Sequence, residues 1–259
     1  LDRVEMSLGI FTTITNPAKR GDNYLEALAC YKELADVVTV VDGERTWPKE
    51  FDWPLIGQHF QKGYNQTDTD WVIHADIDFI FHQNDFKKIK QALRDYPDSP
   101  AVSFYKYQFI LPDRYNIKSR LILAVNKKKF GDRIRFNGAG DLCQPTLDNR
   151  DLDIAEMPQA GLPFYNYEKL SKTKEQIIDD VERMDRAYQR HFGKQLYSSD
   201  TRTAWDGWYQ MVSGRFNKVA THIPLSSHPK YIQETIKNLT PDQWGYSGFG
   251  LIPGRVYDA

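Results

Sequence analysis

The sequence predicts an α/β protein whose central sheet is mostly parallel and covered by helices. Two observations indicate this class. Short apolar segments alternate with segments of helical periodicity through the first hundred residues. Two of these apolar segments also end abruptly in aspartate, as strands of open α/β sheets do where they carry a site. Because we find no repeat and no low-complexity linker, we expect one domain over residues 1–259.

The first half of the chain supplies the alternating pattern. Asp22 is expected to cap the first helix, whose apolar residues recur at helical spacing from Leu25 to Leu34. Asp85 is expected to cap a later helix in the same way. The expected strands are 6–12, 37–41 and 71–75, and a further helix is expected over 58–66.

The second half is less regular. Segments 101–110 and 119–125 are expected to add antiparallel strands, and a glycine-rich segment follows at 135–141. The clearest helix is 173–192, because Thr173 with Gln176 forms a capping box and Gly193 follows its end.

Composition and charge exclude several classes of protein. The net charge of -1 gives no field that would favour nucleic acid. Two cysteines are too few for a disulfide framework. The sequence shows no signal-peptide pattern, and no apolar run approaches the roughly 20 residues of a membrane span. We therefore expect a cytoplasmic protein with no membrane span and no nucleic-acid partner.

The acidic pair Asp76-Ile77-Asp78 directly follows the apolar segment 71–75. In extended backbone, residues i and i+2 point to the same side, so both carboxylates can reach one ion. Hard oxygen ligands select Mg²⁺ or Mn²⁺, and such an ion also neutralises a diphosphate. The alternative interpretation is a solvated Asp-x-Asp turn, which the preceding apolar strand makes less favourable.

The order of several polar segments resembles the GT-A glycosyltransferases, particularly the nucleotide-sugar transferases of glycosyltransferase family 2. No single motif is specific, and the order and spacing carry the resemblance, which covers about residues 5–85 well and continues loosely to about 190. The segments are FTTITN at 11–16, VVDG at 40–43, QKGYN at 61–65 and HADID at 74–78.

This resemblance implies a GT-A, Rossmann-like fold, with a nucleotide-binding half over about 1–110 and an irregular acceptor-side half over about 111–259. It also implies a metal-dependent hexosyltransferase. Such an enzyme moves a hexose from a UDP- or GDP-sugar donor to a hydroxyl acceptor on a glycan or glycoconjugate, with Mn²⁺ or Mg²⁺ as cofactor.

The resemblance also implies residues for the donor. Thr12 and Asp42 are expected to contact the base or ribose, and Lys62 to lie beside the nucleotide. Asp76 is expected to serve both the nucleotide and the metal, with Asp78 as the second metal ligand.

Relatives commonly supply a further metal ligand, often histidine, from a downstream segment. Here Asn166-Tyr167 stands where His-Tyr is expected, so Asn166 is the predicted third ligand, with His222 and His228 as alternatives. An inverting enzyme also needs a carboxylate base. The predicted catalytic residues are Asp141, after two glycines, and Asp153. Three further carboxylates of the same region stay open as bases: Asp148, Asp151 and Glu156.

Three other functions compete with this interpretation. A haloacid-dehalogenase-like phosphatase also uses Asp-x-Asp at a strand end, but normally near its N-terminus, whereas two β-α units precede the pair here. A nucleotidyltransferase would have a glycine-rich first loop with Arg and Lys, of which Lys19-Arg20-Gly21 is only a faint echo. A non-catalytic glycan-binding module would suit the 14% aromatic content.

Overall fold

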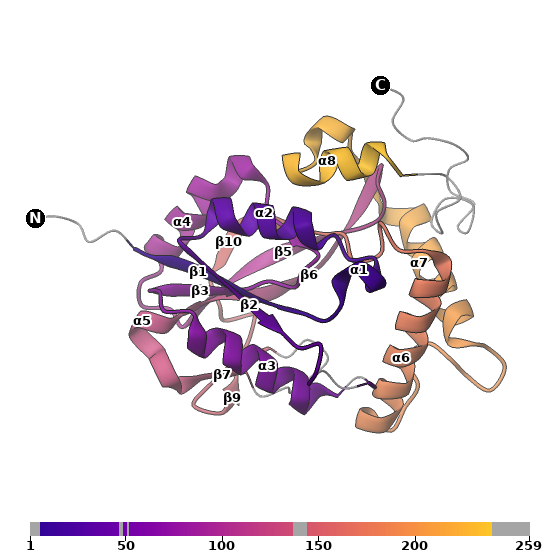
Figure 1. The fold of residues 1–259 in the computed structure, drawn as a ribbon, viewed down its shortest axis with the longest axis horizontal. Helices are drawn as coiled ribbons and strands as arrows, with labels where there is room; N and C mark the ends of the chain where they lie inside the picture. The colour runs from indigo at the N-terminus through magenta and orange to yellow at the C-terminus, as the bar shows by residue number, and fades with distance from the viewer. Residues whose placement is uncertain (1–5, 47–48, 51, 137–143, 240–259) are drawn as a thin grey trace, which may run out of the picture.

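The protein is built around one eight-stranded sheet with helices on both faces (Figure 1). The structure is a computed structural model that describes residues 6–46, 49–50, 52–136 and 144–239. The strand order is β2-β1-β3-β6-β5-β10-β4, and β11 pairs with β6 outside this path. The strands are β1 (Leu8–Ile14), β2 (Val37–Asp42), β3 (Trp71–His74), β4 (Phe79–Ile80), β5 (Ala101–Leu111), β6 (Arg114–Asn126), β10 (Gln159–Asn166) and β11 (Thr221–His222).

Most strands of this sheet run in one direction. β1 is parallel to both β2 and β3, and β10 is parallel to β5. β6 is antiparallel to β3, β5 and β11, and β4 is antiparallel to β10. The predicted mostly parallel α/β sheet is therefore confirmed. The carboxyl ends of β1, β3 and β10 consequently lie toward the same edge.

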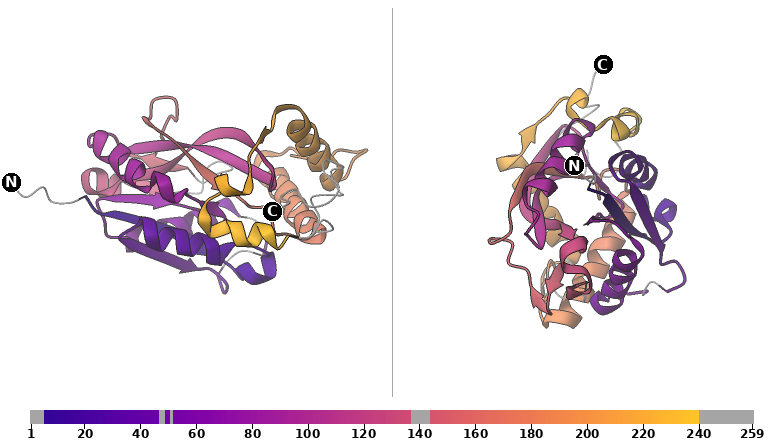
Figure 2. Two further views of the ribbon diagram at one scale, coloured as in Figure 1. Left: turned by 90° about the horizontal axis from the view of Figure 1, so that it is seen from above. Right: turned by 90° about the vertical axis from the view of Figure 1, so that its left-hand side faces the viewer.

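The two faces of the sheet have different coverings (Figures 1 and 2). On one face, α2 (Tyr24–Leu34), α4 (Phe86–Asp95) and α8 (Lys230–Lys237) contribute to the largest apolar core. On the other face, α3 (Trp53–Gln66) packs with a small sheet in a second core. That small sheet contains β7 (Ile134–Phe136), β8 (Pro145–Leu147) and β9 (Arg150–Asp151).

Two long helices stand at the end of the sheet where β1 finishes (Figure 1). They are α6 (Lys174–Phe192) and α7 (Ala204–Val219), which share a third apolar core with Ile110 of β5. The predicted capping box of Thr173 and Gln176 is present, and Gly193 ends α6 with φ of 68°. This left-handed conformation explains the glycine. Two short helices, α1 (Pro17–Arg20) and α5 (Lys127–Phe130), complete the helical elements used below.

Two helices differ in detail from the sequence prediction. α3 begins at Trp53, five residues before the predicted start, because Asp52 accepts a hydrogen bond from Leu55 N and Pro54 fits the first turn. In α2 the cap position is Asn23 rather than Asp22, and Leu25 is 64% exposed. Its buried residues are Ala27, Cys30, Tyr31 and Leu34.

No helix within the described ranges is both long enough and apolar enough to cross a bilayer.

Candidate functional site

A cavity of about 250 Å³ opens at the carboxyl ends of β1 and β3. Its walls include the end of β1 and the loop after it, the Asp-x-Asp turn, the segment after β10, and residues of α3 and β6. Acidic, basic and apolar side chains all face it. The polar lining residues used below are Arg20, Asp22, His74, Asp76, Asp78, Lys106, Asn166, Glu168 and Lys172.

The turn that carries the acidic pair is held in place by the buried hydroxyl group of Tyr31. The Tyr31 hydroxyl on α2 lies 2.5 Å from the Asp76 carbonyl oxygen and 2.7 Å from the Phe79 carbonyl oxygen. Phe79 N also donates to Asp76 O across the turn, at 2.9 Å. The backbone is therefore fixed before any ligand binds, and the two aspartate side chains are presented at the strand end.

Asp78 and Asn166 lie next to each other across two paired segments. Asn166 at the end of β10 is the register partner of Phe79 on β4, and Tyr167 N donates to Asp78 O at 3.1 Å. Asp78 is 7% exposed and Asn166 is 2% exposed. The Oδ1 atoms of both side chains are buried without a hydrogen-bond partner. Unpaired buried oxygens are rare in folded proteins, so each one points to a missing partner.

The pKa of Asp78 is raised, as expected for a buried carboxyl with few favourable partners. Burial raises the pKa of its carboxyl well above the usual range, and the nearby carboxylates of Glu168, Asp76 and Asp22 raise it further. The Lys172 ammonium acts in the opposite direction but does not compensate. A cation placed against Asp78 would reverse this effect by favouring the ionised carboxylate.

Asp76 is the exposed member of the pair. Its side chain is 50% exposed, and its Oδ1 lies 3.4 Å from His74 Nε2, in a geometry that makes no hydrogen bond. The His74 ring is held between Phe60 and Phe11, with ring centroids 4.0 and 4.9 Å away. His74 is therefore fixed in position beside the more accessible carboxylate.

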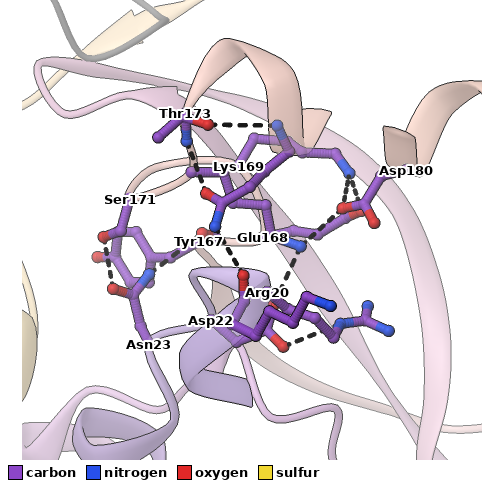
Figure 3. A network of polar contacts seen from close by, with 12 residues as sticks. Arg20, Asp22, Asn23, Tyr167, Glu168, Lys169, Ser171, Thr173 and Asp180 are labelled. Carbon is purple, nitrogen blue, oxygen red and sulfur yellow. Dashed lines mark hydrogen bonds and ion pairs between the residues drawn. The ribbon is translucent and has the colours of Figure 1, made fainter. Parts of the chain in front are cut away.

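A network of buried ion pairs borders the cavity (Figure 3). Lys172 Nζ lies 3.0 Å from Asp22 Oδ1 and 2.7 Å from Asp180 Oδ2. Lys169 Nζ lies 3.1 Å from the same Asp180 oxygen, and Arg20 Nε lies 3.2 Å from Asp22 Oδ2. We call these five residues, Arg20, Asp22, Lys169, Lys172 and Asp180, the ion-pair network. It joins α1, the segment after β10, and α6.

Glu168 links the ion-pair network to the acidic pair. Its side chain is 40% exposed and lines the cavity, and one oxygen lies 2.7 Å from Lys169 Nζ. Burial opposes ionisation, but the Lys169, Lys106 and Lys172 ammonium groups lower the pKa of Glu168 to about 2. The carboxylate is therefore ionised at neutral pH.

Three residues predicted to contact or lie beside the nucleotide, Thr12, Asp42 and Lys62, have different surroundings. Thr12 lies on β1, is fully buried, and has an Oγ1 without a hydrogen-bond partner, while the cavity is lined by the residues after it, Thr13 to Thr15. Asp42 ends β2 and accepts a hydrogen bond from Glu44 N at 2.9 Å. Lys62 is exposed on α3. Neither Asp42 nor Lys62 lines the 250 Å³ cavity, so their roles stay predictions.

Of the two predicted catalytic carboxylates, Asp153 does not line this cavity. Asp141 lies outside the described residues. Asp153 is exposed and its Oδ1 accepts a hydrogen bond from Ala155 N at 2.8 Å. Of the open alternatives, Asp148 pairs with Arg133. Asp151 and Glu156 are exposed.

The two histidines considered as metal ligands have other surroundings. His228 is buried, with Nδ1 2.7 Å from the Tyr167 hydroxyl and Nε2 2.8 Å from the Pro112 carbonyl oxygen. Burial lowers the pKa of His228 to about 4. His222 Nδ1 lies 3.5 Å from Asp113. Neither histidine lines the cavity, whereas Asn166 does.

The sequence interpretation missed most of the charged lining. Glu168 follows Asn166 by two residues, so strand periodicity could have placed both on one side. Asp22 was interpreted only as a helix cap. Lys172 carried no local signal, because it pairs with Asp22, which lies 150 residues earlier in the chain. Arg20 was noted only as part of the segment Lys19-Arg20-Gly21.

The donor set fits a hard divalent cation. Asp76, Asp78 and Asn166 offer two carboxylates and one amide oxygen to the cavity, and two of these side chains have unpaired buried oxygens. Within the described part of the chain, no group of three or more His, Cys, Asp or Glu side chains could hold a metal ion. The metal ion and its three ligands Asp76, Asp78 and Asn166 therefore stay a prediction.

Comparison with known proteins adds no family. The sequence matches no protein-family model. A search of curated proteins likewise gives no significant match.

Proposed function

We propose that this protein is a metal-dependent glycosyltransferase that moves a hexose from a UDP- or GDP-sugar to a hydroxyl group of a glycan or glycoconjugate. One observation carries the proposal. Two carboxylates and an amide line one cavity at the carboxyl ends of β1 and β3, and the buried oxygens Oδ1 of Asp78 and Asn166 have no hydrogen-bond partner. Such a set suits Mn²⁺ or Mg²⁺ bound together with a diphosphate.

Each residue of the site has a specific part in this reaction. Asp78 and Asn166 would hold the ion from the buried side, and Asp76 from the solvent side. The bound ion would stabilise negative charge on the departing diphosphate. The bond between the anomeric carbon and the diphosphate oxygen breaks as the acceptor oxygen bonds to that carbon. In an inverting reaction a carboxylate takes the proton of the acceptor hydroxyl.

Glu168 is the wrong carboxylate for that proton transfer. The neighbouring ammonium groups lower the pKa of Glu168, which makes it a weaker base at neutral pH, since an effective general base has a pKa near the working pH. Its fixed negative charge is better suited to orienting the cations of the cavity. Asp141 and Asp153 therefore remain the proposed bases.

The test is nucleotide binding followed by thermal unfolding. UDP and GDP, with Mn²⁺ or with EDTA, would be added to the wild type, to Asp78→Asn and to the control Asp95→Asn. Asp95 is an exposed residue at the end of α4. Wild type should be stabilised by one nucleotide only with Mn²⁺, by about 2.7 kcal/mol at a concentration 100 times Kd. Asp78→Asn should lose this stabilisation and donor-sugar hydrolysis, and Asp95→Asn should keep both.

Different failures point to different errors. Undiminished Mn²⁺-dependent binding in Asp78→Asn would overturn the metal assignment. No response to any nucleotide or nucleotide-sugar would overturn the donor class. Hydrolysis of a phosphomonoester that depends on Asp76 would instead favour the phosphatase alternative.

A further inference from the structure

A second cavity, of about 150 Å³, adjoins the first and shares Arg20, Glu168 and Met184 with it. Its walls come from α1, β5, β6, the segment after β10, α6, the loop that follows α6, and α7. We call this space the α7 cavity. Because Glu168 lines both cavities, a ligand in the α7 cavity would lie next to the proposed reaction site.

The charged lining of the α7 cavity is mostly cationic. Among the residues that the structure describes, it combines two carboxylates, Glu168 and Asp180, with five cationic side chains, Arg20, Lys118, Lys169, Arg183 and Arg215. Part of the remaining wall is apolar, since Trp208 and Val212 belong to the core that α6 and α7 share. Charges interact more strongly beside apolar walls than in bulk water. The excess of positive charge in this setting therefore favours an anion.

The carboxylate of Asp180 is already shared among several cations. Its oxygens lie within 3.1 Å of the charged nitrogens of Lys169, Lys172 and Arg183. In contrast, Arg215 on α7 makes neither an ion pair nor a hydrogen bond within the described ranges of the chain. The protein's own carboxylates therefore leave positive charge in the cavity without a matching anion.

Arg20 and Arg183 are close enough to repel each other. Burial lowers the pKa of Arg183, and the nearby Arg20 guanidinium lowers it further, whereas Asp180 acts in the opposite direction. The Nε atom of Arg20 is buried without a hydrogen-bond partner, although Asp22 Oδ2 lies 3.2 Å away. An anion bound near both guanidinium groups would reverse the effect on the pKa of Arg183, because it favours the charged form.

Two neutral side chains of the cavity can also donate to an anion. Burial raises the pKa of Tyr197 to about 12, so its hydroxyl keeps its proton at neutral pH. The Gln108 Oε1 atom is buried without a hydrogen-bond partner, and rotation of the amide exchanges this oxygen for the NH₂ group, which has two donors. The cavity therefore offers neutral donors as well as cationic ones.

We propose that the α7 cavity binds a phosphate monoester, held mainly by the guanidinium groups of Arg20, Arg183 and Arg215. Such a group carries a charge of about -1.5 to -2 at pH 7 and three strong acceptor oxygens, and guanidinium groups bind it through paired hydrogen bonds. A carboxylate has one charge and two oxygens, so it would neutralise less of the excess positive charge. The source of the phosphate rests on the proposed function: the acceptor carries it, and is therefore a phosphorylated glycan or glycoconjugate.

The test titrates inorganic phosphate, glucose 6-phosphate, glucuronate and methyl glucoside into the protein by calorimetry, at low salt, in EDTA and without nucleotide. Wild type should bind both phosphates saturably, glucuronate more weakly, and the neutral glucoside not at all. Arg215→Gln should raise the dissociation constants of both phosphates roughly tenfold or more, because a hydrogen bond between charged groups is lost. Arg215→Lys keeps the charge and should bind more tightly than Arg215→Gln.

Two controls separate binding from folding. Arg94→Gln, at an exposed arginine on α4 outside the cavity, is the matched substitution and should bind as wild type does. Without ligand, the unfolding midpoint of Arg215→Gln should equal or exceed that of wild type, because the variant removes one cation from an excess of positive charge.

Three results would overturn the inference. One is a wild type that does not bind glucose 6-phosphate, or binds glucuronate or methyl glucoside as tightly. Another is undiminished binding of glucose 6-phosphate by Arg215→Gln. The third is displacement of glucose 6-phosphate by UDP or GDP with Mn²⁺, which would assign the cavity to the diphosphate of the donor. In EDTA, Asp78→Asn should bind glucose 6-phosphate at least as tightly as wild type does, so failure of this inference is distinguishable from failure of the proposed donor chemistry.

Discussion

Two neighbouring groups of buried polar side chains differ in whether their polar atoms have partners within the protein. In the ion-pair network, Lys172 is 1% exposed and has carboxylate oxygens of Asp22 and Asp180 within 3.0 Å. In the acidic site, by which we mean Asp76, Asp78 and Asn166, the side chains of Asp78 and Asn166 are nearly as buried, yet each has an unpaired Oδ1. Both groups lie in or beside one cavity.

This difference separates polar groups that stabilise the fold from polar groups that would bind a ligand. Buried charges cost free energy unless they are paired, so the ion-pair network is satisfied within the protein and fixes three segments relative to one another. The acidic site retains the free-energy cost of its unpaired oxygens, because no side chain pairs with them. Proteins tolerate such local conflicts mainly where a ligand resolves them. The contrast predicts that substitutions in the two groups change stability with opposite sign.

The largest expected effect is in the ion-pair network. Lys172→Met should lower the free energy of unfolding by about 3–5 kcal/mol, because it leaves buried carboxylates without their shared cation. Urea unfolding at pH 7 measures this loss. Lys237→Met, whose exposed ammonium lies 3.5 Å from Glu234, is the control and should cost about 0.5 kcal/mol or less. A loss below about 1 kcal/mol in Lys172→Met would contradict a structural role.

The same variant gives a pH test. The Lys169 and Lys172 ammonium groups hold the pKa of Asp180 below its usual range. A carboxyl with a lowered folded-state pKa stabilises the fold above its unfolded pKa of about 3.9, and this contribution is lost as the pH falls further. The difference between wild type and Lys172→Met should therefore shrink below about pH 4. A constant difference between pH 3 and pH 7 would contradict this.

A substitution in the acidic site should change the free energy of unfolding in the opposite direction and by a smaller amount. In EDTA, Asp78→Asn should raise the free energy of unfolding by about 1–3 kcal/mol. The raised pKa of the buried Asp78 carboxyl favours the unfolded state at neutral pH, where the carboxyl ionises freely, and a neutral amide does not carry this cost. Mn²⁺ should then stabilise wild type but not the variant. Equal destabilisation of Asp78→Asn with and without Mn²⁺ would place Asp78 with the ion-pair network instead.

Local sequence signals predicted the elements that need no distant partner. The capping box at Thr173 and the strand before Asp76 depend on a few adjacent residues, and both are in the structure, the strand as Trp71–His74. The helix over α7 was not predicted, although Thr203 caps it with a hydrogen bond from Asp206 N at 3.1 Å. Its interior contains glycines and aromatic residues, which weaken the helical pattern.

The site was predictable only where its residues follow a strand. Asp76 and Asp78 follow β3 and Asn166 ends β10, and all three line one cavity. Lys172 could not be found this way. Its burial follows from Asp22 and Asp180, which lie on separate elements, and no spacing in the sequence reports that meeting.

The smallest expected effect tests the amide at the third position. Asn166→Asp adds an anionic oxygen beside Asp78, so it should tighten Mn²⁺ binding roughly tenfold, since ligand charge tunes affinity for such ions. Without metal, the added negative charge should lower the unfolding midpoint. The control is Asn23→Asp, the same change at a paired amide whose Nδ2 donates to Tyr167 O at 3.4 Å. It should lower the midpoint without changing Mn²⁺ affinity, as measured by calorimetric titration. If both variants bind Mn²⁺ as wild type does, Asn166 does not touch the ion.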